Sequence, residues 1–149
     1  MERDSGTSDG TKAGFAEPRQ RWRIAFRRRA GADAEAPRDL VPDWLDRLAA
    51  TGLPLAIRGG GKARTALALG APLPVRMAAE RELADLLLAE RLPAWRVREA
   101  VTAALPNGCD LVGLDDVWLG APPLAGAIAG ADYRVTLAPE GDPGAEVVR

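Results

Sequence analysis

The sequence predicts a single α+β domain in which two main helices cover one face of a mainly antiparallel sheet. Three observations lead to this expectation. Residues 21–28 alternate between an apolar side chain and a row made mostly of arginines, over the length of one strand. Residues 40–50 and 93–105 repeat apolar side chains at helical spacing. Short apolar runs of strand length stand before, between and after these two segments.

The first strand predicts one buried face and one basic face. The buried face carries Trp22, and the opposite face carries Arg21, Arg23 and Arg27. A row of arginines can contact the phosphates of a nucleic acid. More often such a row is a solvated sheet face or pairs with acidic neighbours, and the formal net charge of −1 favours that second interpretation.

The first helix is expected over about 40–50. Pro42 suits its first turn, and Asp39 suits the positive end of the helix dipole. Gly52 is a natural residue for the helix end, and Pro54 prevents continuation. Trp44 lies on the apolar stripe and is expected to be a core residue rather than a ligand-stacking surface.

The remaining elements follow in order. We expect strands at 55–57 and 65–69, followed by a turn or single helical turn at 78–82. A strand is expected at 83–89, although periodicity alone would also allow a helix there. After it we expect a helix at 93–105, a strand at 110–119, a short helix at 122–128 and a last strand at 133–137. Two β-α-β halves in this order indicate a ferredoxin-like split β-α-β sandwich, extended by the short C-terminal helix and strand. Residues 19–138 are expected to form this domain, with disordered tails at 1–18 and 139–149.

Composition excludes several chemistries. The chain has no histidine, so it lacks the commonest general base and metal ligand. Its single cysteine, Cys109, cannot form an internal disulfide or a multi-thiolate cluster, and is expected to be structural. The serines, Ser5 and Ser8, lie in the expected N-terminal tail, which argues against a serine nucleophile. We therefore expect no cofactor, no metal and no membrane span, and a cytoplasmic location.

A basic, glycine-rich loop at 58–64 superficially resembles a phosphate-binding site. A Walker A loop needs glycine where this chain has Ala56, and Ser or Thr where it has Ala63, so the motif fails at both ends. Backbone amides in such a turn could still hold an anion, with charge from Arg58, Lys62 and Arg64. The favoured interpretation is a flexible, solvated hairpin loop.

Carboxylates offer an alternative function. Asp39, Glu82 and Asp85 could serve a small carboxylate-based enzyme or ligand-binding domain, which requires a pocket where at least two of them converge. Asp115 and Asp116 are adjacent on a strand, so their side chains point to opposite faces.

Several short stretches carry a family resemblance across roughly 21–137. They are Trp22-Arg23-Ile24-Ala25-Phe26, Asp39-Leu40 with Trp44 and Leu48, Gly52-Leu53-Pro54-Leu55-Ala56, Ala66-Leu67-Ala68-Leu69, Pro72-Leu73-Pro74 with Glu82 and Asp85, Ala104-Leu105-Pro106-Asn107-Gly108 and Ala131-Asp132-Tyr133-Arg134-Val135. In this order and spacing they resemble the radical SAM-linked domain of unknown function, which accompanies bacterial radical SAM proteins.

The departures from that family matter for function. Members carry a Ser-His-Leu-Asp stretch where this chain has Ala36-Pro37-Arg38-Asp39, and a Gly-Phe-x-Pro-His-Pro stretch where it has residues 60–65. The resemblance implies a non-catalytic accessory domain that binds a protein partner, such as a radical SAM protein encoded nearby, or RNA. Candidate contacts are the six basic residues named above together with Asp39. A diverged remnant that stabilises a neighbouring gene product is a third interpretation, and the sequence does not indicate an oligomeric state.

Overall fold

The computed structural model describes residues 16–31, 37–56, 66–71, 74 and 77–137, with the side chains of residues 37–39 left undescribed. The elements in chain order are β1 (Gln20–Arg28), α1 (Pro37–Ala50), β2 (Leu67–Leu69), β3 (Ala79–Leu88), α2 (Ala94–Ala104), β4 (Cys109–Val117) and α3 (Leu124–Ala127). Helices α1 and α2, strands β1 and β4 and the short helix α3 all lie where the sequence places them, with ends that differ by one to three residues.

The four strands form one sheet in the order β2-β3-β1-β4, and every neighbouring pair is antiparallel. Strand β1 is central: Arg23 lies opposite Asp85 of β3 on one side and opposite Asp115 of β4 on the other. Each β-α-β half therefore encloses a strand of the other half, which is the split β-α-β arrangement. The structure confirms the predicted ferredoxin-like α+β fold.

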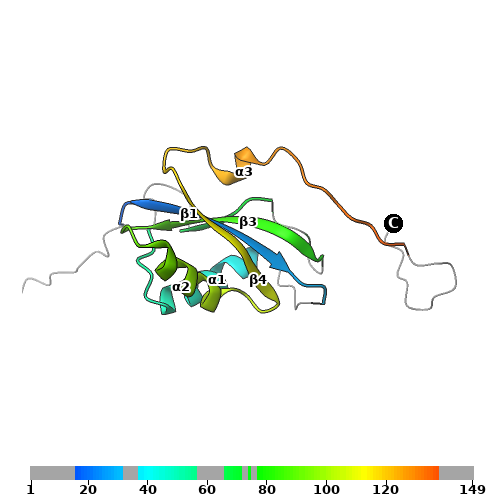
Figure 1. The fold of residues 1–149 in the computed structure, drawn as a ribbon, viewed down its shortest axis with the longest axis horizontal. Helices are drawn as coiled ribbons and strands as arrows, with labels where there is room; N and C mark the ends of the chain where they lie inside the picture. The colour runs from blue at the N-terminus through cyan, green and yellow to red at the C-terminus, as the bar shows by residue number, and fades with distance from the viewer. Residues whose placement is uncertain (1–15, 32–36, 57–65, 72–73, 75–76, 138–149) are drawn as a thin grey trace, which may run out of the picture.

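The core lies between one face of this sheet and helices α1 and α2, which both cover that face (Figure 1). Trp44 of α1 is completely buried and meets Phe26 of β1 edge to face, with ring centroids 5.2 Å apart. Burial of a side chain of this size removes enough apolar surface to stabilise the fold by roughly 3 kcal/mol. The expectation that Trp44 is a core anchor is confirmed.

Helix α2 presents a narrow apolar stripe to the sheet. Its buried residues, Val97, Ala100, Val101 and Ala104, recur at spacings of three and four. The helix ends at Ala104 with Leu105 as its C-cap, and Gly108 then takes a positive φ of 75° in the turn that leads into β4. The Pro-Asn-Gly stop read from the sequence is thus a left-handed turn that only glycine adopts without strain.

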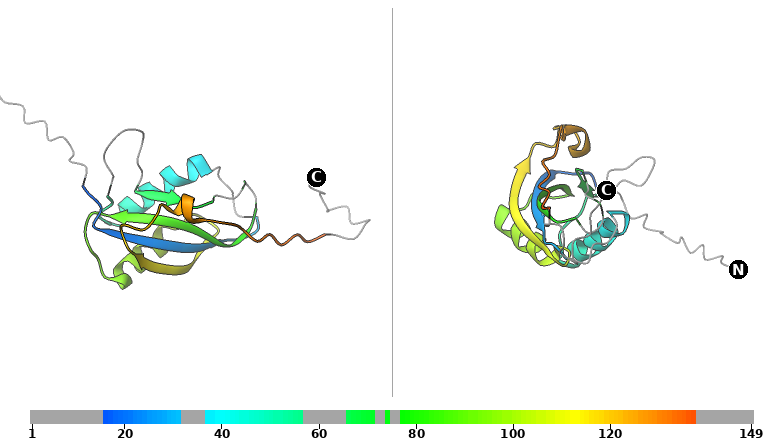
Figure 2. Two further views of the ribbon diagram at one scale, coloured as in Figure 1. Left: turned by 90° about the horizontal axis from the view of Figure 1, so that it is seen from above. Right: turned by 90° about the vertical axis from the view of Figure 1, so that its right-hand side faces the viewer.

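The opposite face of the sheet is partly covered by the segment 118–128. After β4 the chain turns back, and α3 lies across the sheet from α1 and α2 (Figures 1 and 2). Leu124 is buried there, 3% exposed. A Cβ atom added to Gly70, just after β2, would lie 2.3 Å from Ile128 Cδ1, so glycine allows α3 to approach β2 closely. We call residues 118–128 the strap.

Three predicted details differ from the structure. Strand β3 begins at Ala79, because residues 79–82, expected as a turn, continue the antiparallel pairing with β1. Leu55 makes only an isolated bridge to Leu88, so the strand expected at 55–57 does not form within the described residues. Residues 133–137 have the predicted alternation but form no strand, because no strand among the described residues pairs with their backbone.

Among the residues that the structure describes, no helix is long and apolar enough to cross a membrane.

Candidate functional site

The arginines of β1 meet Asp85 on the sheet face opposite α1 and α2. Arg21 donates its Nε–H to Asp85 Oδ2 at 2.8 Å, and a second bond joins its Nη2 to the same oxygen. Arg23 donates to both carboxylate oxygens, at 2.9 Å and 3.1 Å. The side chains of Arg21 and Asp85 are 7% and 6% exposed, so this pair is shielded from solvent.

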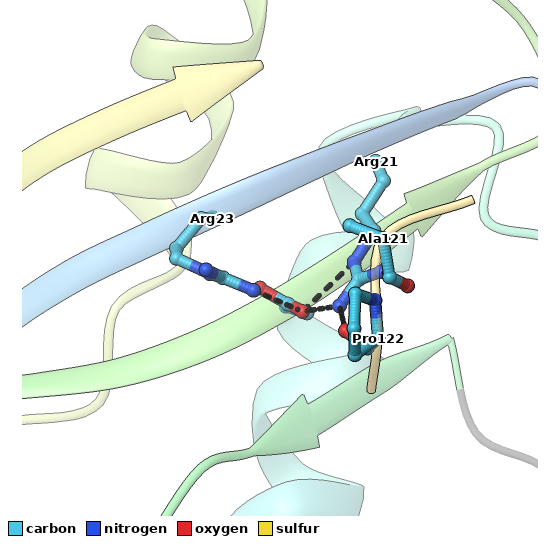
Figure 3. Close-up of polar contacts among 5 residues, drawn as sticks. Arg21, Arg23, Ala121 and Pro122 are labelled. Carbon is cyan, nitrogen blue, oxygen red and sulfur yellow. Dashed lines mark hydrogen bonds and ion pairs between the residues drawn. The ribbon is translucent and has the colours of Figure 1, made fainter. Parts of the chain in front are cut away.

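Arg21 also holds the strap. Its Nη1 and Nη2 groups donate to the backbone carbonyls of Ala121 and Pro122, both at 2.8 Å (Figure 3). Together with the two bonds to Asp85, these contacts give the Arg21 guanidinium four hydrogen bonds and a counterion inside the fold. The hydrogen bond to Asp85 raises the pKa of Arg23 further, and the Asp115 charge acts in the same direction. Arg21 is therefore committed to the fold, and a phosphate would have to displace Asp85 to reach it. Arg23 also binds Asp85, although its side chain is 26% exposed.

A second buried ion pair lies on the other face, at the end of the sheet where β1 finishes. Arg28 donates to Glu82 Oε1 at 2.8 Å, and both side chains are buried. Burial raises the pKa of Glu82, and the Arg28 cation and its hydrogen bond only partly oppose this. Burial likewise raises the pKa of the neighbouring Cys109 thiol, which disfavours the reactive thiolate.

The remaining predicted contacts are dispersed or lie outside the described residues. Arg27 is exposed near the end of β1, opposite Asp110 of β4. The backbone of Asp39 lies in the first turn of α1. The basic loop with Arg58, Lys62 and Arg64 lies outside the described residues. Among the described residues, the predicted basic contacts on β1 are divided between arginines that bind Asp85 and the exposed Arg27.

Of the carboxylates that the alternative function requires, the structure describes the side chains of Glu82 and Asp85, and these two do not converge. Glu82 and Asp85 are three residues apart on a regular stretch of β3, so they project to opposite faces of the sheet. Each is bound to arginine, Glu82 to Arg28 and Asp85 to Arg21. Within the described part of the chain no group of three or more His, Cys, Asp or Glu side chains is arranged to hold a metal ion.

A different surface stands out at the end of the sheet where β1 begins. Trp95, in the first turn of α2, is 67% exposed, and Trp118, just after β4, is 78% exposed. The chain segments that carry them are linked by the side-chain amide of Gln20. Its Nε2 donates to the Leu92 carbonyl and, at 3.0 Å, to Asp116, and its Oε1 accepts from the Leu92 N–H. We call this region the tryptophan end.

An exposed ion pair and an open groove lie beside the tryptophan end. Arg91 lies 3.5 Å from Asp116, and its side chain is largely exposed. An open groove of about 860 Å³ is lined by 16–19 and 89–91 beside it. A surface that combines exposed tryptophan with arginine is typical of protein–protein contact sites.

Sequence reasoning missed this surface. The strand expected at 110–119 includes Trp118 in its apolar content, whereas β4 ends at Val117 and the indole lies over Gly120 in the following turn. Trp95 lies beside Ala94 and two residues before Val97, off the apolar stripe of its helix. A tryptophan off the stripe of an amphipathic helix was the signal that could have indicated an exposed contact residue.

Most of the chain matches a known protein family. Residues 21–147 match the family described as an uncharacterized protein conserved in bacteria (DUF2344). The chain belongs to this family. The DUF2344 match spans every strand and helix described above and extends beyond α3, so the strap and the segment after it are part of the family's domain. No curated protein and no solved structure matches the chain. The description of DUF2344 names no radical SAM protein.

Proposed function

We propose that this DUF2344 domain is a non-catalytic, cytoplasmic accessory domain that binds a protein partner of radical SAM type through the tryptophan end. The observation that carries the proposal is the exposure of Trp95 and Trp118 at one end of the sheet. Large aromatic side chains are costly to leave in water and are the residues that most often dominate binding energy at protein interfaces.

The pairing of three β1 arginines with buried carboxylates favours a protein partner over RNA for this domain. Binding to RNA requires cations that are free to meet phosphates. Arg21 and Arg23 already bind Asp85, and Arg28 binds Glu82. The tryptophan end instead presents both signs of charge, through Arg91, Glu90 and Asp116. A mixed polar rim around aromatic side chains suits a folded protein.

The test is a binding titration with a radical SAM protein encoded beside this gene. The double variant Trp95→Ala/Trp118→Ala is expected to weaken binding about a hundredfold, since two central aromatic contacts are lost. Met77→Ala is the matched control, because Met77 is an exposed apolar residue near the opposite end of the sheet, beside the start of β3. Equal binding by both variants, or no binding by the wild type, overturns the proposal.

An RNA titration at two salt concentrations distinguishes the remaining function. Association with RNA would weaken steeply as salt rises, because phosphate contacts release counterions. We expect no RNA association at low salt. Salt-dependent RNA binding without binding to the neighbouring protein would favour the nucleic-acid function instead.

A further inference from the structure

Residues 133–137 form an exposed segment with the character of a strand. Tyr133, Val135 and Leu137 are 63%, 76% and 84% exposed, and they alternate with Arg134 and Thr136. The segment leaves the body of the domain as an extended chain (Figure 2, left). Three large apolar side chains on one face of an extended backbone would be half-buried if the segment joined a sheet with side chains beside them on the same face.

The segment has the residue pattern of the central strand. Tyr133-Arg134-Val135-Thr136-Leu137 matches Trp22-Arg23-Ile24-Ala25-Phe26 of β1 position by position: an aromatic, an arginine, a β-branched residue, a small residue and a large apolar residue. In β1 this pattern pairs antiparallel with β4, with Arg23 opposite Asp115 and Ile24 opposite Leu114. A segment with the same pattern is therefore suited to the same strand.

The outer edge of β4 can accept such a segment. Strand β4 is the last strand on its side of the sheet, so within the described residues only its inner edge is paired. The register shift between Ala25 and Phe26 leaves Val112 as an extra residue, and 113–117 form a regular stretch beyond it. Leu114 is only half-buried against the core, and Asp115 is exposed on the opposite face.

We propose that residues 133–137 add as an antiparallel strand to the outer edge of β4 in a second copy of this chain. Arg134 would lie opposite Asp115, and Val135 would lie opposite Leu114, as Arg23 and Ile24 do on the inner edge. Exchange in both directions gives a two-fold symmetric dimer. This inference goes beyond the proposed function, because it concerns self-association through a different segment.

A second copy fits better than the chain's own β4. Arg134 donates to Glu80, near the start of β3, at 2.8 Å. Glu80 lies at the end of the sheet opposite 113–117, and β1 separates β3 from β4. The contact between Arg134 and Glu80 is largely exposed and is readily exchanged for a better one.

The first test is the oligomeric state of the full chain, measured by sedimentation equilibrium up to about 1 mM, the weak end of specific association. The wild type is expected to dimerise. Val135→Pro/Thr136→Pro is expected to abolish the dimer, because successive N–H groups point to opposite edges and one of the two prolines removes a pairing donor. Thr136→Ser is the control. The proline sites are exposed and unpaired by any strand, so the melting temperature of the body should not change.

The second test is charge reversal. Arg134→Asp and Asp115→Arg should each weaken the dimer about tenfold, since like charges then face each other across the strands. The double variant should restore it. Cysteine cross-linking between a chain carrying Arg134→Cys and one carrying Asp115→Cys, both in a Cys109→Ala background, should yield a heterodimer.

Three results would overturn the inference. They are a wild type that stays monomeric throughout the concentration range, a dimer that the double proline variant leaves intact, and cross-linking within a single chain that carries both cysteines. The double proline variant should still bind the neighbouring protein, because that binding requires Trp95 and Trp118. Loss of the dimer and loss of partner binding therefore test the two proposals independently.

Discussion

Arg21 of β1 and Asp85 of β3 form a buried ion pair that fixes the strap to the sheet. The same guanidinium that binds Asp85 donates to the carbonyls of Ala121 and Pro122. Removing the charge of Asp85 would leave the buried Arg21 without its carboxylate partner and beside the cation of Arg23. A buried charge without its partner is strongly destabilising.

Asp85→Asn is therefore expected to lower the free energy of unfolding by about 3 kcal/mol. Urea denaturation monitored by tryptophan fluorescence measures this. Asp115→Asn is the control, because Asp115 is an exposed aspartate on the same sheet face, and its change should stay within about 0.5 kcal/mol. Equal effects of the two substitutions would show that the Arg21–Asp85 pair contributes no more than a surface contact.

The packing of α3 against β2 gives a second prediction. Valine at Gly70 would place its Cβ atom within 3.2 Å of Leu124 side-chain atoms and closer still to Ile128 Cδ1, so these side chains, or the strap that carries them, must move. Gly70→Val is expected to lower the free energy of unfolding by about 2 kcal/mol, as other overpacked contacts do. Hydrogen exchange should become faster in 121–128, while β1 and β3 remain protected.

Gly126→Ala is the matched control for the strap. Gly126 lies in α3 with no atom within 4 Å of an added Cβ, so alanine should leave stability unchanged or raise it by up to about 1 kcal/mol. If Gly70→Val and Gly126→Ala have the same effect on exchange, close packing at Gly70 does not position α3.

Glu82 gives a pH-dependent prediction. Burial raises the pKa of Glu82 in the folded chain, so the folded state binds this proton more tightly than the unfolded state. The resulting stabilisation is fully present below the unfolded pKa, about 4.3 for glutamate, and is lost as pH rises through the folded value. The stability of the wild type relative to Glu82→Gln should therefore increase as the pH is lowered from 7 through this window.

Asp110 should show the opposite slope. Its hydrogen bond from Arg29 lowers the pKa of Asp110, so its contribution is present above the unfolded pKa and is lost as pH falls through the folded value. The stability of the wild type relative to Asp110→Asn should decrease on acidification. Chemical denaturation at a series of pH values measures how the difference in unfolding free energy between the wild type and each variant changes with pH. If this difference changed in the same direction for both variants, the opposite pKa shifts of Glu82 and Asp110 would be contradicted.

The fourth prediction concerns Cys109. Burial raises the pKa of its thiol, which reduces the thiolate fraction near neutral pH. Modification by a disulfide reagent at pH 7.5 should be at least about tenfold slower in the folded chain than in urea. The folded rate should continue to rise with pH after the unfolded rate has levelled off. Matching rates and matching pH profiles would show that Cys109 is an ordinary exposed thiol.

Much of the fold could be predicted because its signals are local. Alternation identified β1, and apolar residues at helical spacing identified α1 and α2. The beginning of β3 was missed because 79–82 contain charged residues, and Glu82 is buried only because Arg28 neutralises it from a neighbouring strand. A pairing between residues 54 positions apart leaves no local pattern.

The candidate site was harder to predict than the fold. The arginine row of β1 was visible in the sequence, and one proposed fate for such a row, pairing with acidic neighbours, holds for Arg21 and Arg23. The sequence suggests a different role for the partner, Asp85, as a carboxylate of a small enzyme or ligand-binding domain. The tryptophan end was not recognised, because exposure depends on where β4 stops and on which side of α2 meets the sheet.

The sequence by itself determined β1, β4 and the three helices in their order, the absence of histidine chemistry and the failure of the glycine-rich loop as a Walker A motif. These properties depend on residue type and short spacing. The tertiary structure decided that Arg21 and Arg23 both bind Asp85, that Glu82 and Asp85 face apart, and that Trp95 and Trp118 share one end of the sheet. It also left 133–137 unpaired, because a strand exists only where another backbone supplies its hydrogen bonds.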